Sequence, residues 1–103
     1  MPQLNPPAPT AAIFTAAPRK VEVFWDHELG GLGAIQKLNW AVVIDGLPAV
    51  INTATALIDR VRLDLGLGGG LNGDNTVTYA PPPFDVVGTQ GAPAAAFALF
   101  PVT

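Results

Sequence analysis

Apolar and polar residues alternate along several short stretches of this chain, and residues 20–26 show the pattern clearly. Val21, Val23 and Trp25 share one phase of the alternation, whereas Phe24 lies in the other phase among acidic residues. A period of two, carried by β-branched and aromatic side chains, is typical of a β-strand with one buried face. We therefore predict a strand here, with Phe24 on its outer face.

Other runs of this kind follow, and the most regular one covers residues 59–67. There Val61, Leu63, Leu65 and Leu67 occupy one phase, and we expect all four to point to the same side. No stretch keeps a helical period over the ten or more residues that a crossover between parallel strands requires. The predicted strands are residues 11–17, 20–26, 39–44, 48–55, 59–67, 76–80 and 94–102.

Turn residues separate these runs. Asp45-Gly46 lies between residues 39–44 and 48–55, and it favours a hairpin because glycine adopts a positive φ without strain. Residues 34–38 are predicted to form one helical turn at most. About seven short strands with frequent turns indicate an all-β fold, an antiparallel β-sandwich of immunoglobulin-like type.

The shared phase of the strands also predicts the core. Large aromatic side chains dominate small cores, so for Trp25, Trp40 and Tyr79 we favour core packing over a carbohydrate-stacking platform. The predicted core residues are Val21, Val23, Trp25, Trp40, Val42, Ile44, Val61, Leu63, Leu65, Val77, Tyr79 and Phe97.

The start of the chain differs from the rest. Residues 1–10 hold four prolines and no charged side chain, and we call them the N-terminal arm; residues 11–103 form the predicted sandwich domain. Proline fixes φ and removes an amide donor, so we expect an extended arm that lies along a neighbouring subunit or frays. The residues expected to contact a partner are Pro2, Leu4, Pro6, Pro7 and Pro9 of the arm, together with the exposed Phe24.

Composition narrows the class of partner. Half of the 103 residues are hydrophobic, 13% are charged, and the net charge is −3 with the basic residues scattered. We therefore expect no nucleic-acid partner, because neutralising phosphates requires a basic patch. The apolar runs are shorter than a membrane span, so we also expect no membrane partner. The chain starts with Met and has no basic and apolar leader, which predicts a complete product made in a cytoplasm.

The residue types that most enzymes use are scarce. The chain has no Cys, no Ser and a single histidine, His27, so a cysteine or serine nucleophile and the usual zinc ligands are missing. Asn72, Asp74 and Asn75 could bind calcium weakly, although a turn explains them better. We predict no enzymatic activity, no catalytic residue, no cofactor and no metal site.

Several segments, in their order along the chain, also carry a family likeness. They are Val21-Glu-Val-Phe-Trp25, Asn39-Trp-Ala-Val-Val-Ile-Asp-Gly46, Arg60-Val-Arg-Leu-Asp-Leu65, Gly73-Asp-Asn-Thr-Val-Thr-Tyr-Ala-Pro-Pro82 and Gly91-Ala-Pro-Ala-Ala-Ala-Phe97. This series resembles the bacterial immunoglobulin-like repeats of the SwmB type over about residues 19–103. Such repeats occur in tandem in bacterial surface proteins, and related domains decorate phage particles. The resemblance implies a sandwich and brings no active-site residue.

This chain departs from those repeats in three ways: it has one copy, no secretion signal and an added arm. These departures favour a stand-alone structural protein of a virion, such as a phage capsid decoration protein made in the host cytoplasm. The expected partners are the major capsid protein or other virion subunits, and copies of the chain itself. The alternative is an immunoglobulin-like adhesion module that binds carbohydrate or a cell surface, which coplanar exposed aromatic side chains would support.

Overall fold

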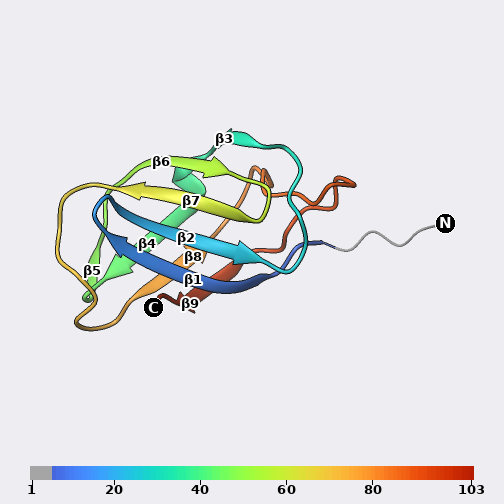
Figure 1. The fold of residues 1–103 in the computed structure, drawn as a ribbon. Helices are drawn as coiled ribbons and strands as arrows, with labels where there is room; N and C mark the ends of the chain where they lie inside the picture. Colours follow the sequence, from blue (N-terminus) through green and yellow to red (C-terminus); the bar gives the residue numbers. More distant parts are fainter. Residues whose placement is uncertain (1–5) are drawn as a thin grey trace.

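Two antiparallel sheets packed face to face make up the fold, as Figure 1 shows for the computed structural model, which describes residues 6–103. The first sheet has five strands in the order β1-β2-β7-β6-β3. Their bounds are β1 Pro9–Ala16, β2 Arg19–Trp25, β7 Arg60–Leu65, β6 Ile51–Ala56 and β3 Gly33–Ile35.

The second sheet has four strands in the order β5-β4-β8-β9. Their bounds are β5 Leu47–Pro48, β4 Trp40–Ile44, β8 Thr76–Tyr79 and β9 Phe97–Pro101. The one helical element among residues 6–103 is a short 3-10 turn, η1, at Lys37–Asn39. The structure therefore confirms the all-β fold and the antiparallel β-sandwich.

The core lies between the sheets where the alternation places it. Every predicted core residue is buried except Phe97, which is partly buried and packs against the others. Loop residues complete the core beyond the predicted set: Leu29, Val86, Ala94 and Val102 are also buried. Strand phase thus identifies the large apolar side chains that β2, β4, β7 and β8 place between the sheets.

Phe97 lies at the centre of the aromatic part of this core. Its ring centroid is 6.0 Å from each of Trp25, Trp40 and Tyr79, and it meets both indoles at steep angles of 68° and 72°. Trp40 and Tyr79 lie closer together, at 4.8 Å. The indole Nε1 atoms of both tryptophans are buried and have no hydrogen-bond partner among residues 6–103, so these rings contribute through packing.

The turn between β4 and β5 is the predicted hairpin. Asp45 and Gly46 have φ values of 55° and 72°, the left-handed pair that a two-residue hairpin turn requires. The strand predicted after it, residues 48–55, is instead divided between β5 and β6, which belong to different sheets. The chain therefore crosses from one sheet to the other near Ala49, where the local pattern shows no break.

Two further expectations need correction. Leu67 does not lie on the side of Val61, Leu63 and Leu65: β7 ends at Leu65, and Leu67 is fully exposed on the glycine-rich loop that follows. Residues 34–38 do not form a helical turn by themselves, because β3 occupies Gly33–Ile35 and the 3-10 turn begins at Lys37. Three residues are too few to show a period of two.

Both ends of the described chain are joined to the sandwich. β1 begins at Pro9, before the predicted domain boundary, and Ala8 exchanges hydrogen bonds with Asp26 through its N–H (2.8 Å) and its C=O (3.0 Å). At the other end, Thr103 bonds to Phe14 N–H and to Ala12 C=O (2.8 and 2.9 Å). The last residue therefore covers part of the free edge of β1.

β9 is an irregular edge strand. Its register against β8 shifts between Val77 and Tyr79, and Leu99 has a φ of 55°, a conformation that side chains other than glycine seldom adopt. Leu99 N–H donates to Thr78 Oγ1 at 3.1 Å instead of to a strand partner.

Candidate interaction surfaces

The outer face of the five-stranded sheet carries paired charges. Glu22 contacts both Lys20 (3.6 Å) and Arg60 (3.1 Å), and Arg62 contacts Asp64 at 3.3 Å. Phe24 lies on this outer face as predicted, but it is only partly exposed because the Arg60 guanidinium stacks over its ring at 5.6 Å. Ion pairs that neutralise one another are typical of a solvated face.

The outer face of the four-stranded sheet carries no charge. The four strands contain no Asp, Glu, Lys, Arg or His. Cross-strand pairs place Ala41 beside Thr78, and Val43 beside both Thr76 and Pro48, on the same side of the sheet. With Leu99 and Pro101 of β9 they make a continuous surface, the neutral face, defined as Ala41, Val43, Pro48, Thr76, Thr78, Leu99 and Pro101.

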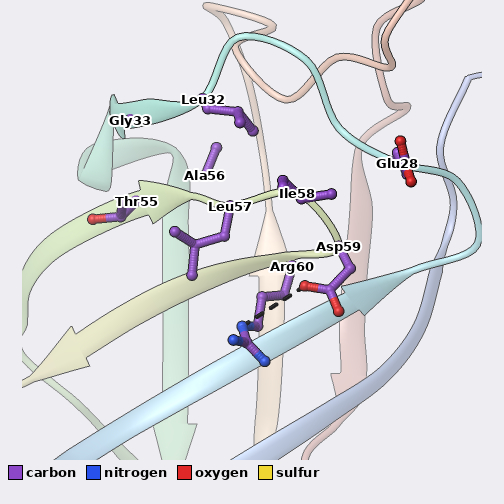
Figure 2. A pocket seen from close by; sticks show the side chains of 9 residues that line it. All are labelled: Glu28, Leu32, Gly33, Thr55, Ala56, Leu57, Ile58, Asp59 and Arg60. Carbon is purple, nitrogen blue, oxygen red and sulfur yellow. Dashed lines mark ion pairs between the residues drawn. The ribbon is translucent and has the colours of Figure 1, made fainter.

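A second surface is a groove at the end of the sandwich, which we call the end groove. It has a volume of about 730 Å³ and lies between the segment before β3 and the turn joining β6 to β7. Figure 2 shows Leu32, Ala56 and Ile58 around its apolar part, with the Asp59–Arg60 ion pair (3.8 Å) at one rim. Leu32 and Ile58 are 54% and 57% exposed, so the groove offers apolar area to a partner.

A third surface lies at the opposite end, on the loop after β7. The Arg19 guanidinium donates to Gly66 C=O at 2.7 Å and to Gly69 C=O at 3.2 Å. These bonds hold the loop so that Leu67 borders a hollow of about 180 Å³, which Leu47 and Val50 also line. Exposed aliphatic side chains gathered around a hollow are a contact surface of the kind that binds protein.

Two titratable side chains, Tyr79 and Asp26, have shifted pKa values. Burial raises the pKa of the Tyr79 hydroxyl, which accepts the Val86 N–H at 3.4 Å and so fixes the segment before β9. The pKa of Asp26 is lowered, chiefly by the Ala8 N–H and next by His27, whose Nδ1 lies 2.7 Å away. Among residues 6–103, no three His, Cys, Asp or Glu side chains gather as metal ligands would.

The Asn72–Asn75 cluster forms a turn contact. Asn75 Oδ1 accepts the Asp45 N–H at 2.8 Å, and Asn75 Nδ2 donates to Gly73 C=O at 2.7 Å. These bonds tie the loop before β8 to the β4–β5 hairpin.

Only some of the partner-binding residues predicted in the arm lie within the described residues 6–103. Pro2 and Leu4 lie outside this range. Pro6 is exposed, Pro7 is buried and Pro9 is partly buried at the start of β1. Phe24 lies on β2 beside β1, where Pro9 pairs with Trp25 and Thr10 Oγ1 donates to Phe24 C=O at 3.3 Å, so the structure brings Phe24 close to Pro9 of the arm.

Sequence reasoning missed the neutral face and the end groove. A signal for the neutral face was present, because the segments 40–44, 76–79 and 97–101 all lack charge, whereas β2 and β7 of the other sheet carry paired ions. No sequence signal marks the groove, since Leu32 and Ile58 come from separate loops.

The chain matches no protein-family model, no curated protein and no solved structure. Within the described part of the chain, no helix has the length and apolar character needed to cross a bilayer.

Proposed function

We propose that this protein is a structural subunit of a virion, a capsid decoration protein that docks on the outer shell through its neutral face. The observation that carries the proposal is the asymmetry of the sandwich: one sheet is charged and ion-paired on its outside, and the other has no charge at all. The centres of protein interfaces are depleted of charged residues, because removing an unpaired charge from water is costly.

The size of the neutral face supports attachment in many copies. Four strands spaced by ~4.8 Å, with at most five residues of ~3.4 Å each, outline about 330 Å². A stable pairwise interface buries about 800 Å² on each partner. One such contact is therefore weak alone, and it becomes effective when many sites are repeated on one particle and further surfaces contribute.

We further propose that the sandwich is of the immunoglobulin-like type. The order β1-β2-β7-β6 matches the A-B-E-D sheet of that fold, and β5-β4-β8-β9 matches C′-C-F-G. On this assignment Trp40 takes the place of the buried tryptophan of strand C, and β3 is an additional edge strand.

The adhesion alternative receives less support. A sugar-stacking site needs exposed aromatic rings, whereas Trp25, Trp40 and Tyr79 are all buried. Phe84 is exposed by about half, and none of these three rings lies beside it on the surface.

The test measures binding of the labelled chain to shells assembled from the major capsid protein of the same genome, by co-sedimentation. Thr78→Glu places a charge in the middle of the neutral face and should lower binding at least tenfold, roughly 1.4 kcal/mol. Thr15→Glu is the matched control, because Thr15 faces outward on β1 opposite Lys20. Shells that bind no chain, or that bind both variants equally well, would contradict the proposal.

A further inference from the structure

We infer that Asn72 is a site of spontaneous deamidation, at which a carboxylate replaces the side-chain amide at the edge of the neutral face and weakens docking. The reaction needs no enzyme, because the reacting groups are the Asn72 side chain and the backbone N–H of Gly73. The effect on shell binding rests on the proposed function, whereas the reaction itself does not.

The reaction takes place at the peptide bond between these two residues. The Gly73 nitrogen loses its proton to a base in the solvent and attacks Cγ of Asn72. An N–Cγ bond forms, the Cγ–Nδ2 bond breaks, and the side-chain nitrogen takes up a proton and leaves as ammonia. Water then opens the five-membered succinimide ring at either carbonyl carbon. One opening gives aspartate, and the other gives isoaspartate, in which the backbone runs through the side chain.

Both reacting groups are free to approach each other. Asn72 and Gly73 are exposed and lie in the bend that precedes β8, outside every strand of the described chain. Within residues 6–103, the Asn72 side chain and the Gly73 N–H have no hydrogen-bond partner. Glycine has no Cβ to crowd the attacking nitrogen, and its backbone is permissive enough for the ring to close.

The other asparagines of the chain lack this combination. Asn39 is buried, and its Nδ2 donates to a backbone carbonyl at 2.7 Å. Both polar atoms of the Asn75 side chain are hydrogen-bonded. Asn52 lies within β6 and precedes a threonine, whose branched Cβ crowds the backbone nitrogen. Asn5 precedes a proline, whose nitrogen carries no hydrogen. The reaction is therefore specific to Asn72.

The new carboxylate forms beside a hollow in the neutral face. Gly73 and Asp74 line this hollow of about 640 Å³ together with Val43, Leu99 and Pro101 of the face. An interface that excludes water from an uncharged surface tolerates an unpaired charge poorly. Deamidated chains therefore bind the shell more weakly than fresh chains.

Acidic neighbours add to this effect. Asp74 is two residues from Asn72, and Asp45 Oδ1 lies 2.7 Å from the place that a Cβ atom on Gly73 would occupy. A third carboxylate at this turn concentrates negative charge where the loop is bonded to the β4–β5 hairpin.

Mass spectrometry of the full chain tests the reaction without any shell. In mildly alkaline buffer, wild type should slowly gain about one dalton per chain, because an NH2 group is replaced by OH. Peptide mapping should place the gain at Asn72, with isoaspartate among the products. In mildly acidic buffer the gain should be at least tenfold slower, since less of the Gly73 amide is deprotonated.

Asn72→Gln blocks the reaction, because attack on the longer side chain must close a six-membered ring, and its mass gain should be at least tenfold slower. Asn52→Gln is the matched control at an exposed asparagine and should gain mass as wild type does. A wild type that gains no mass, a gain that maps to another asparagine, or an equal gain in Asn72→Gln would overturn the site.

The effect on docking is tested with two variants at the same position. Asn72→Asp carries the charge of the product, and Asn72→Gln is its neutral counterpart. In the co-sedimentation assay with shells, Asn72→Asp should bind at least threefold more weakly than Asn72→Gln. Equal binding of both would overturn the effect on docking. Shells that bind neither variant would contradict the proposed function, and the mass gain at Asn72 would still stand, so the two proposals fail separately.

Discussion

At the scale of single residues, the aromatic core shows how a small sandwich can manage without disulfides. The chain has no cysteine, and the space between the two sheets is filled in part by packed rings around Phe97. A domain of about this size has only a few kcal/mol of stability to lose, so each ring matters.

Trp40→Ala tests this packing. Trp40 is 5% exposed and touches both Tyr79 and Phe97, so its truncation should lower the free energy of unfolding by about 3–5 kcal/mol, as large core truncations do. Leu47→Ala, at a residue 68% exposed, should change it by less than about 0.5 kcal/mol. Urea denaturation followed by tryptophan fluorescence measures both; equal effects would contradict the core assignment.

Asp26 gives a pH-dependent contact. The Ala8 N–H and His27 lower the pKa of this carboxyl from its ordinary value of 3.8, so the charged form is favoured in the folded chain. The contact therefore stabilises fully above the unfolded pKa and is lost as the pH falls through the lower, folded value. The Ala8 amide should keep its hydrogen-exchange protection at pH 4 and lose it only as the pH falls through the folded pKa, which lies below 3.8. In Asp26→Ala protection should be low at every pH, and unchanged protection there would exclude the carboxyl as the cause.

At the scale of elements, the loop after β7 depends on one arginine. A Cβ atom on Gly68 would lie 2.5 Å from Arg19 Nη2, whereas one on Gly69 would meet nothing within 4 Å. Glycine at position 68 therefore lets the guanidinium reach the carbonyls of Gly66 and Gly69.

Gly68→Ala should displace the guanidinium and cost about 1–2 kcal/mol in the free energy of unfolding, the scale of hydrogen bonds to a charged group. Gly69→Ala should cost less than about 0.5 kcal/mol. The decisive measurement is a double-mutant cycle: in an Arg19→Ala background, Gly68→Ala should lose most of its effect. Additive effects would show that Gly68 acts without Arg19.

The alternation of apolar and polar residues predicts some of these strands and not others. Strand phase predicted the buried side of β2, β4, β7 and β8, because alternation is a local property. It could not assign β5 and β6 to different sheets or detect the three-residue β3, since both depend on pairing with distant strands. The alternation continues to Leu67, although β7 ends at Leu65, so the pattern alone does not show that Leu67 lies in the loop.

At the scale of the whole molecule, the two outer faces differ in how they respond to salt. Ion pairs on the five-stranded sheet are screened as ionic strength rises, whereas the neutral face has no charge to screen. No single strand is enough to form the candidate site. The neutral face exists only because cross-strand pairing places Ala41, Val43, Thr76 and Thr78 side by side.

Attachment to shells should therefore depend little on salt. Between 50 mM and 500 mM salt, binding of wild type should change by less than about threefold, since electrostatic attraction contributes little to a neutral contact. Titration of the labelled chain at each ionic strength measures this directly. A fall of tenfold or more would indicate that the charged sheet makes the contact, with Lys20→Ala and Arg62→Ala as the variants to identify it.

The irregular β9 affects how readily copies of the chain can aggregate through this sheet edge. A sheet with an uncharged face and an open edge is a template for uncontrolled stacking of strands into insoluble aggregates. β9 counters this with Leu99 in a left-handed conformation and with Pro101, which has no amide hydrogen to offer. Left-handed leucine costs about 1–2 kcal/mol. The conformation of Leu99 thus costs stability and limits how far another strand can pair with the open edge of β9.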